Sequence, residues 1–183
     1  MSFETSSSSY TNSILTTSSK NELESLDVDT NVIVYMFNDE KDLNEEQIKE
    51  SCVFRELTLK QAFVSKLINI IYTQSDTKLI PIPKNSMSVT TFNNIMDYLI
   101  LNNGDETYKS PEPITVAYKK FWGNDQDTNF IEKFAKTELC NIIKASNYID
   151  CQKLLLLSAS FLASNVKSNP SILKTLLQIK IDE

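Results

Sequence analysis

The sequence predicts an α+β fold in which a small sheet is covered by helices. Two short runs, at residues 31–37 and 52–57, are dense in β-branched and aromatic side chains and indicate strands. Most later segments carry apolar residues at intervals of three and four, which indicates amphipathic helices. The order strand, strand, helix, strand, helix, loop and then helices is typical of an α+β domain with one core. A chain of 183 residues is long enough for such a domain and a tail.

The first half of the predicted sheet follows a polar N-terminal segment. Residues 1–30 are rich in serine and threonine, and their apolar area is too small to offset the entropy lost on ordering. We predict a disordered tail here, with a phosphorylated tail as the alternative. Residues 31–37 form a buried strand. The strongly charged segment 38–51 is either a loop or a short exposed helix, and residues 52–57 form a second strand antiparallel to the first.

A helix is expected to begin near Thr58 and to carry one apolar stripe as far as Ile71. The segment 78–84 follows, and its two prolines lack backbone donors, which indicates an edge strand or an extended link. A second amphipathic helix is predicted over residues 86–101. Its apolar stripe consists of Val89, Phe92, Ile95, Met96, Leu99 and Ile100.

The rest of the chain is predicted to be a loop followed by helices. Residues 102–115 contain glycine, proline and polar residues and indicate the loop. Trp122, beyond it, is interpreted as an anchor on the core, with a partner contact as the alternative. The helical region has one break after residue 146 and another before Pro170, which suits the first position of a last helix. We expect Asp150 to cap the helix that it precedes.

The composition argues against catalytic and cofactor-binding roles. Two glycines exclude a glycine-rich phosphate loop, and the absence of histidine excludes Ser-His-Asp and Cys-His machinery. The three cysteines, Cys52, Cys140 and Cys151, show no CxxC spacing, so neither a metal site nor a redox site is expected. An enzyme that uses scattered carboxylates stays open as a minor hypothesis, since sequence spacing does not show which carboxylates converge.

Charge and hydropathy limit the partners that we expect. The net charge is −6 and no long basic cluster occurs, so direct binding of nucleic acid is not expected. The apolar segment 154–163 is about half of the roughly 20 residues that a membrane span needs. The N-terminus lacks the basic start and apolar run of a secretory signal. We therefore expect a protein of the reducing cell interior, in the cytoplasm or the nucleus.

Three motifs, in this order and spacing, resemble the Skp-type adaptors of cullin–RING ubiquitin ligases. They are LIPIPKNSMSVTTFNNIMDYL at residues 79–99, ASNYID at 145–150 and NPSILKTLLQI at 169–179, with Trp122 between the first two. The resemblance implies a BTB/POZ-like fold. It divides the chain into a BTB/POZ-like domain at residues 31–119 and a helical extension at 120–183. The domain would contain an acidic insertion at 38–51 and a loop at 102–119.

The resemblance implies a non-catalytic adaptor that bridges a cullin and an F-box protein, without a cofactor. By resemblance, Asn147 and Tyr148 are candidates for the cullin contact, with local packing of the loop as the alternative. The four adjacent leucines at 154–157 point around a helix, so one core face cannot bury all of them. Leu154, Leu155 and Leu162 are expected in the core. The candidates for the F-box or other partner contact, each with core packing as the alternative, are Leu157, Phe161, Leu173, Leu176, Leu177 and Ile179.

The sequence departs from the family pattern in three places, one of which is a few added residues between Trp122 and Phe130. The acidic segment 38–51 resembles an insertion after the first strand, and the sequence ends at IKIDE, whereas typical members continue into a further helix that helps to clasp the F-box. The latter two departures favour a second hypothesis, a BTB-type interaction module or scaffold subunit outside ubiquitin ligases. Such a module would be able to form a homodimer.

Overall fold

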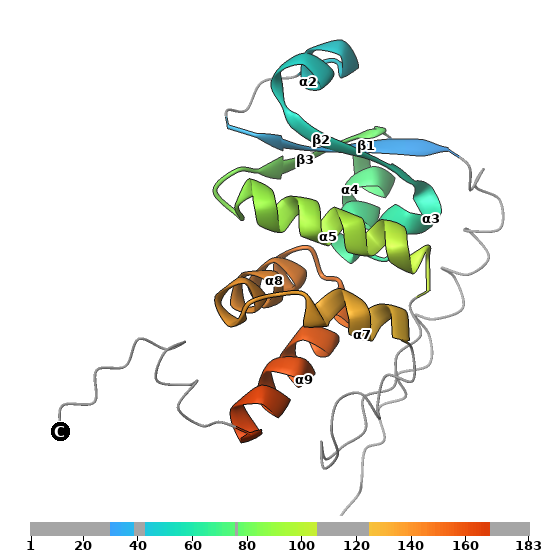
Figure 1. The fold of residues 1–183 in the computed structure, drawn as a ribbon. Helices are drawn as coiled ribbons and strands as arrows, with labels where there is room; N and C mark the ends of the chain where they lie inside the picture. The colour runs from blue at the N-terminus through green and yellow to red at the C-terminus, as the bar shows by residue number, and fades with distance from the viewer. Residues whose placement is uncertain (1–29, 39–42, 76, 106–124, 169–183) are drawn as a thin grey trace, which may run out of the picture.

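The computed structural model describes residues 30–38, 43–75, 77–105 and 125–168. Several expectations fall outside these residues: the tail at 1–29, most of the predicted loop, Trp122, and the helix at Pro170. The same holds for four of the partner candidates, Leu173, Leu176, Leu177 and Ile179. Within the described residues the chain is a mixed α+β structure of three strands and seven helices (Figure 1).

The sheet has three strands in the order β2-β1-β3. β1 (Asn31–Phe37) pairs antiparallel with β2 (Val53–Thr58), as predicted. β3 (Leu79–Pro83) pairs with β1 on the other side and runs parallel to it, so the proline-containing segment is an edge strand and not a link. The parallel pairing requires a long crossover, which the helices between β2 and β3 supply.

The central strand β1 is buried on both faces, which explains its unbroken run of apolar residues. Val32, Val34 and Met36 point into the main core, together with Ile80 and Ile82 of β3. The alternate residues Ile33 and Tyr35 belong to a second apolar cluster, because successive side chains of a strand point to opposite faces.

The helix α2 (Glu45–Ser51) covers the outer face of the sheet, on the side away from the other helices (Figure 1). The Asn44 side chain accepts from the Gln47 amide and the Gln47 side chain accepts from the Asn44 amide, which forms a capping box. The charged segment at 38–51 therefore includes a helix, one of the two alternatives expected. The helix is exposed as expected, apart from Ile48, which is completely buried.

The inner face of the sheet packs against α3 (Leu59–Ala62), α4 (Lys66–Ser75) and α5 (Val89–Asn102) (Figure 1). The single helix expected after Thr58 is wrong, because the chain forms two helices with a break at residues 63–65. Thr58 caps the first of them through a capping box with Gln61.

The apolar stripe predicted for α5 is confirmed in its centre and wrong at its ends. Phe92, Ile95, Met96 and Leu99 are fully buried, whereas Val89 and Ile100 are 43% and 41% exposed. α5 begins at the Ser88 cap, whose hydroxyl accepts from the Thr91 amide. It ends where Asn103 adopts a left-handed conformation (φ 45°), which asparagine tolerates better than most residues.

Three more helices complete the described structure: α7 (Asp125–Glu132), α8 (Lys136–Tyr148) and α9 (Gln152–Ser168). α8 packs against both α5 and α9. The main apolar cluster runs from the sheet through α5 to Leu154 and Leu157 of α9, so one core joins the sheet to these helices. None of the helices in the described ranges is long and apolar enough to cross a membrane.

Candidate partner-binding surface

The C-terminal end of α8 exposes two of the predicted contact residues. The helix break expected after residue 146 is wrong, because Asn147 and Tyr148 are the last two residues of α8 and the turn follows at residues 149 and 150. Asn147 and Tyr148 are both exposed, and 41% of the Tyr148 surface remains accessible. The residues on either side, Ser146 and Ile149, are completely buried. The side-chain amide of Asn147 and the phenol of Tyr148 are therefore accessible to a partner, while the neighbouring residues anchor the backbone in the core.

Hydrogen bonds to the start of α4 fix the turn at residues 149 and 150, directly after Tyr148. The Ser65 hydroxyl donates to the Ile149 carbonyl oxygen at 2.6 Å. The Lys66 amide donates to the Asp150 carbonyl oxygen and the Leu67 amide donates to that of Ile149, each at 3.3 Å. Ser65 is fully buried, so the hydroxyl bond joins two segments 84 residues apart without competition from solvent.

The conformation of Asp150 differs from the expectation that it caps α9. Its carboxylate accepts from the Gln152 side-chain amide at 2.6 Å and lies 3.9 Å from the Lys66 ammonium. Its backbone is left-handed (φ 51°), a conformation that aspartate tolerates better than most residues. Asp150 thus allows the sharp reversal between α8 and α9 and does not serve as a cap for the α9 backbone.

The row of leucines in α9 divides between the core and partly covered positions. Leu154 and Leu157 are completely buried, and Leu155 and Leu156 are half-buried. The partner assignment of Leu157 is therefore wrong, since its side chain belongs to the main core. Phe161 is half-buried and packs against the edge of that core, as Leu162 does.

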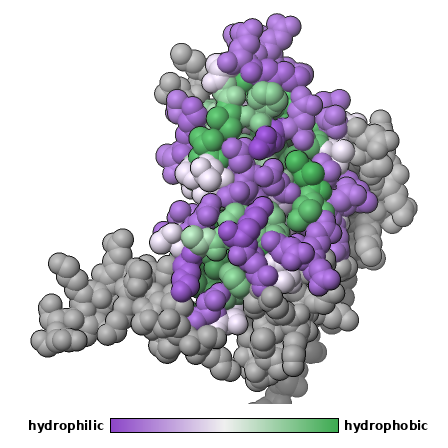
Figure 2. Space-filling model, viewed as in Figure 1, coloured by the Kyte–Doolittle hydropathy of each residue, from purple (hydrophilic) through white to green (hydrophobic). Residues whose placement is uncertain are grey.

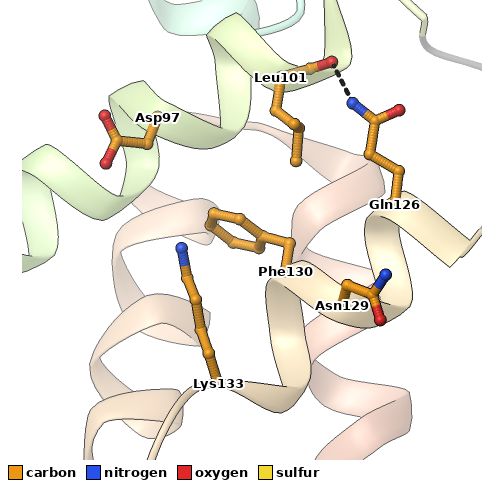
Figure 3. Close-up of a pocket in the computed structure, with 6 residues that line it drawn as sticks. All are labelled: Asp97, Leu101, Gln126, Asn129, Phe130 and Lys133. Atoms are coloured by element: carbon orange, nitrogen blue, oxygen red, sulfur yellow. Dashed lines mark hydrogen bonds between the residues drawn. The ribbon is translucent and has the colours of Figure 1, made fainter.

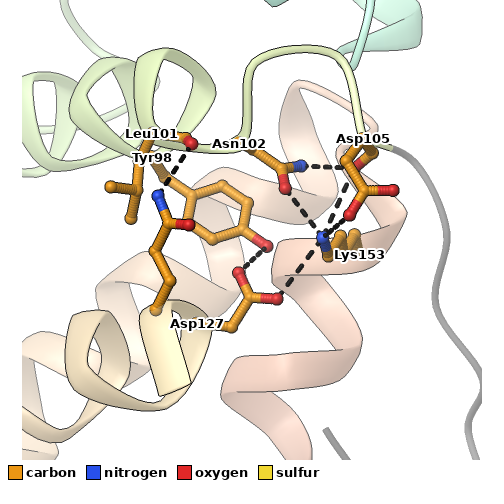
Figure 4. A network of polar contacts seen from close by, with 7 residues as sticks. Tyr98, Leu101, Asn102, Asp105, Asp127 and Lys153 are labelled. Atoms are coloured by element: carbon orange, nitrogen blue, oxygen red, sulfur yellow. Dashed lines mark hydrogen bonds and ion pairs between the residues drawn. The ribbon is translucent and has the colours of Figure 1, made fainter. Parts of the chain in front are cut away.

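A buried polar network joins α9 to α5 and α7 (Figure 4). The Lys153 side chain is only 3% exposed, and its ammonium donates to Asn102 Oδ1 at 2.7 Å. It also pairs with the carboxylates of Asp105 at 3.0 Å and of Asp127 at 3.3 Å. The Tyr98 hydroxyl donates to the second oxygen of Asp127 at 3.2 Å.

The burial of these side chains and the pairing of their charges indicate that the network has a structural role. Burial, reinforced by the Asp127 carboxylate, raises the pKa of Tyr98 well above its ordinary value, so the phenol stays protonated and donates. Asp105 and Asp127 precede and follow residues 106–124, and one ammonium holds both carboxylates. Sequence reasoning missed the network, because its members lie on different elements that are far apart in the sequence.

A shallow groove of about 520 Å³ lies between α5 and α7 (Figure 3). Its floor includes Leu101 and Phe130, and the Lys133 ammonium lies 4.3 Å from the centre of the Phe130 ring. The Gln126 side chain donates to the Leu101 carbonyl oxygen at 3.0 Å. Among the described residues that line the groove, Asp97 is the one carboxylate.

Exposed apolar side chains are spread over several helices. The large ones among the described residues are Ile70 of α4, Val89 and Ile100 of α5, and Tyr148 of α8. Val89 and Ile100 are 11 positions apart, which is about 16 Å along a helix, so they do not form one patch. The face seen in Figure 2 accordingly alternates between hydrophilic and hydrophobic residues.

The described residues contain no cluster of histidine, cysteine, aspartate or glutamate suited to a metal ion. Cys151 is buried, whereas Cys52 and Cys140 are half-buried, and all three are free thiols. No protein-family model and no curated protein matches the chain.

Proposed function

We propose that this chain is a non-catalytic adaptor of the Skp type, with a BTB/POZ-like fold, that bridges a cullin and an F-box protein in the cytoplasm or nucleus. The observation that carries the proposal is the exposed pair Asn147–Tyr148 at the C-terminal end of α8, directly before a turn that hydrogen bonds fix to α4. The motif that resembles the family's cullin contact is thus a surface feature of the described structure. The sheet order β2-β1-β3, with α3, α4 and α5 on the inner face (Figure 1) and the Pro81-Ile82-Pro83 strand parallel to β1, supports the same proposal.

The physical basis is preorganisation. Part of the Tyr148 side chain contacts the protein and the rest is accessible. The accessible part offers a large apolar area and a polar tip to a partner. Because the backbone on both sides of Tyr148 is buried or hydrogen bonded, little conformational entropy is lost when a partner binds there. Aromatic residues in such positions often dominate the binding free energy of an interface.

In the proposed adaptor, the helical C-terminal region holds the F-box protein. Phe161 is the candidate that the described part of the chain leaves partly accessible, whereas Leu157 no longer qualifies. Leu173, Leu176, Leu177 and Ile179 remain candidates by resemblance and lie outside the described residues.

Binding of purified cullin N-terminal repeats to the Tyr148→Ala variant tests the proposal. Loss of a dominant aromatic contact costs about 2 kcal/mol or more, so we expect the dissociation constant to rise about 30-fold. Thr137→Ala, at an exposed position near the other end of α8, is the matched control and should bind as the unmodified chain does. The Tyr148→Ala variant should keep its thermal stability and its binding to an F-box protein. Absence of cullin binding by the unmodified chain, or an equal loss of all three properties, contradicts the proposal.

A second candidate is a BTB-type interaction module outside ubiquitin ligases. The position of α2 favours it, because this helix adds the exposed carboxylates Glu45, Glu46 and Glu50 to the side of the sheet that lacks other helices. Affinity purification followed by mass spectrometry separates the two candidates. Recovery of a stable stoichiometric partner without any cullin or F-box protein supports the second candidate.

A further inference from the structure

The outer face of the sheet carries an apolar cluster of its own. Ile33 and Tyr35 of β1 and Ile48 of α2 are its buried members. The partly buried side chains that pack against them are Phe37, Leu43, Cys52, Phe54 and Leu79. In the register of the sheet, Tyr35 lies opposite Phe54 and Ile33 lies opposite Leu79, so these four side chains share one face.

The helix α2 covers this face through few contacts. Of its seven residues, Ile48 alone is buried. The ion pairs of Lys49 with Glu45 and Glu56, at 2.6 Å and 3.2 Å, lie at the surface, where such pairs stabilise little. A segment with few buried apolar contacts is expected to open locally, at a lower free energy than the global unfolding of the chain.

We propose that α2 is a displaceable cover that keeps the outer face of the sheet from associating with a second copy of this chain. The covered side chains Ile33, Tyr35, Phe54 and Leu79 carry no charge. When α2 moves away, they form an apolar patch of the kind that monomers seldom expose. The same patch on two copies is self-complementary about a twofold axis.

The negative charge of α2 supports a second copy of this chain as the partner that the helix keeps away from the sheet. With α2 in place, the exposed side chains Glu45, Glu46 and Glu50 face any second copy of a chain whose net charge is −6. Like charges across an interface oppose association. When α2 moves away from the sheet, its carboxylates move with it and the apolar surface becomes accessible at the same time. This inference does not depend on the proposed adaptor function.

The test combines a variant with a measurement on the unmodified chain. Ile48→Asp places a charge at the buried contact of α2 and should release the helix. We expect its molar mass by light scattering to double as the concentration rises from low to high micromolar, with the far-ultraviolet circular dichroism largely retained. Ile70→Asp makes the same change at a side chain that is 50% exposed, and this control should stay monomeric like the unmodified protein.

Hydrogen exchange on the unmodified chain covers the case in which the variant fails to fold. The amides of residues 48–51 should exchange roughly tenfold or more faster than those of β1 and α5, since local opening precedes global unfolding. Equal exchange rates for α2 and the core overturn the inference. A folded Ile48→Asp variant that stays monomeric at every concentration overturns it as well.

Discussion

Replacement of Lys153 by methionine should destabilise the protein far more than a surface substitution does. Methionine keeps most of the length and volume of lysine and removes the charge. The Asp127 carboxylate, whose side chain is only 4% exposed, then loses the Lys153 ammonium and keeps the Tyr98 hydroxyl as a donor. Loss of one partner from a buried ion pair costs about 3 to 5 kcal/mol, because the remaining buried charge loses the attraction that offset its desolvation.

The expected cost is a large share of the total stability, which is about 5 to 15 kcal/mol for a typical domain. In thermal unfolding it corresponds to a fall in Tm of about 6 to 20 °C for a chain of this size. Asp105→Asn removes the other carboxylate of the network and serves as the internal comparison. The Asp105 side chain is 47% exposed, so this change should cost about 1 kcal/mol or less.

Urea unfolding followed by circular dichroism measures the free energies of unfolding of these variants. The double variant Lys153→Met with Asp127→Asn removes both buried charges and should be more stable than Lys153→Met alone. A cost below about 1 kcal/mol for Lys153→Met, similar to that of Asp105→Asn, would show that the ammonium is not the buried partner of Asp127 and would refute this reasoning.

Two further substitutions test other parts of the structure. In the folded chain burial raises the pKa of Tyr98, so above pH 10 the unfolded state releases a proton that the folded state retains, and stability falls by up to about 1.4 kcal/mol per pH unit. Tyr98→Phe should lose this part of the alkaline slope, and an unchanged pH profile from pH 9 to 11 would contradict the assignment. Ser65→Ala removes a donor to the Ile149 carbonyl oxygen and an acceptor for the Ile68 amide, so chemical unfolding should show a loss of about 1 to 3 kcal/mol. Thr73→Ala, where the hydroxyl bonds at an exposed helix position, is the control and should cost much less.

The sequence predicted the elements whose pattern is local. The unbroken apolar run at residues 31–37 indicated a buried strand, and β1 is the central strand of the sheet with both faces covered. Prolines at 81 and 83 indicated an edge strand because proline has no amide donor, and β3 lies at the edge. The centre of α5 followed from its spacing. Its ends did not, because whether Val89 and Ile100 are covered depends on neighbouring elements.

Features that depend on residues far apart in the sequence were not predictable from local sequence patterns. The break between α3 and α4 at residues 63–65 depends on Ser65, whose hydroxyl bonds to Ile149. The sequence did not single out Lys153, because its burial becomes apparent once Asp105 and Asp127 lie beside it. Of the partner candidates, the exposure of Asn147 and Tyr148 agrees with the predicted role. Their assignment to a cullin contact remains a prediction.

The two prolines of β3 affect how this protein behaves at high concentration. The Lys84 amide donates to the Phe37 carbonyl oxygen, so by alternation the amide positions of residues 80 and 82 also face β1. Pro81 and Pro83 therefore place their missing donors on the outward side of the strand, where an incoming strand would need them. Strand addition, the step by which open sheet edges recruit further chains and begin fibrous aggregates, is blocked there without weakening the ladder to β1.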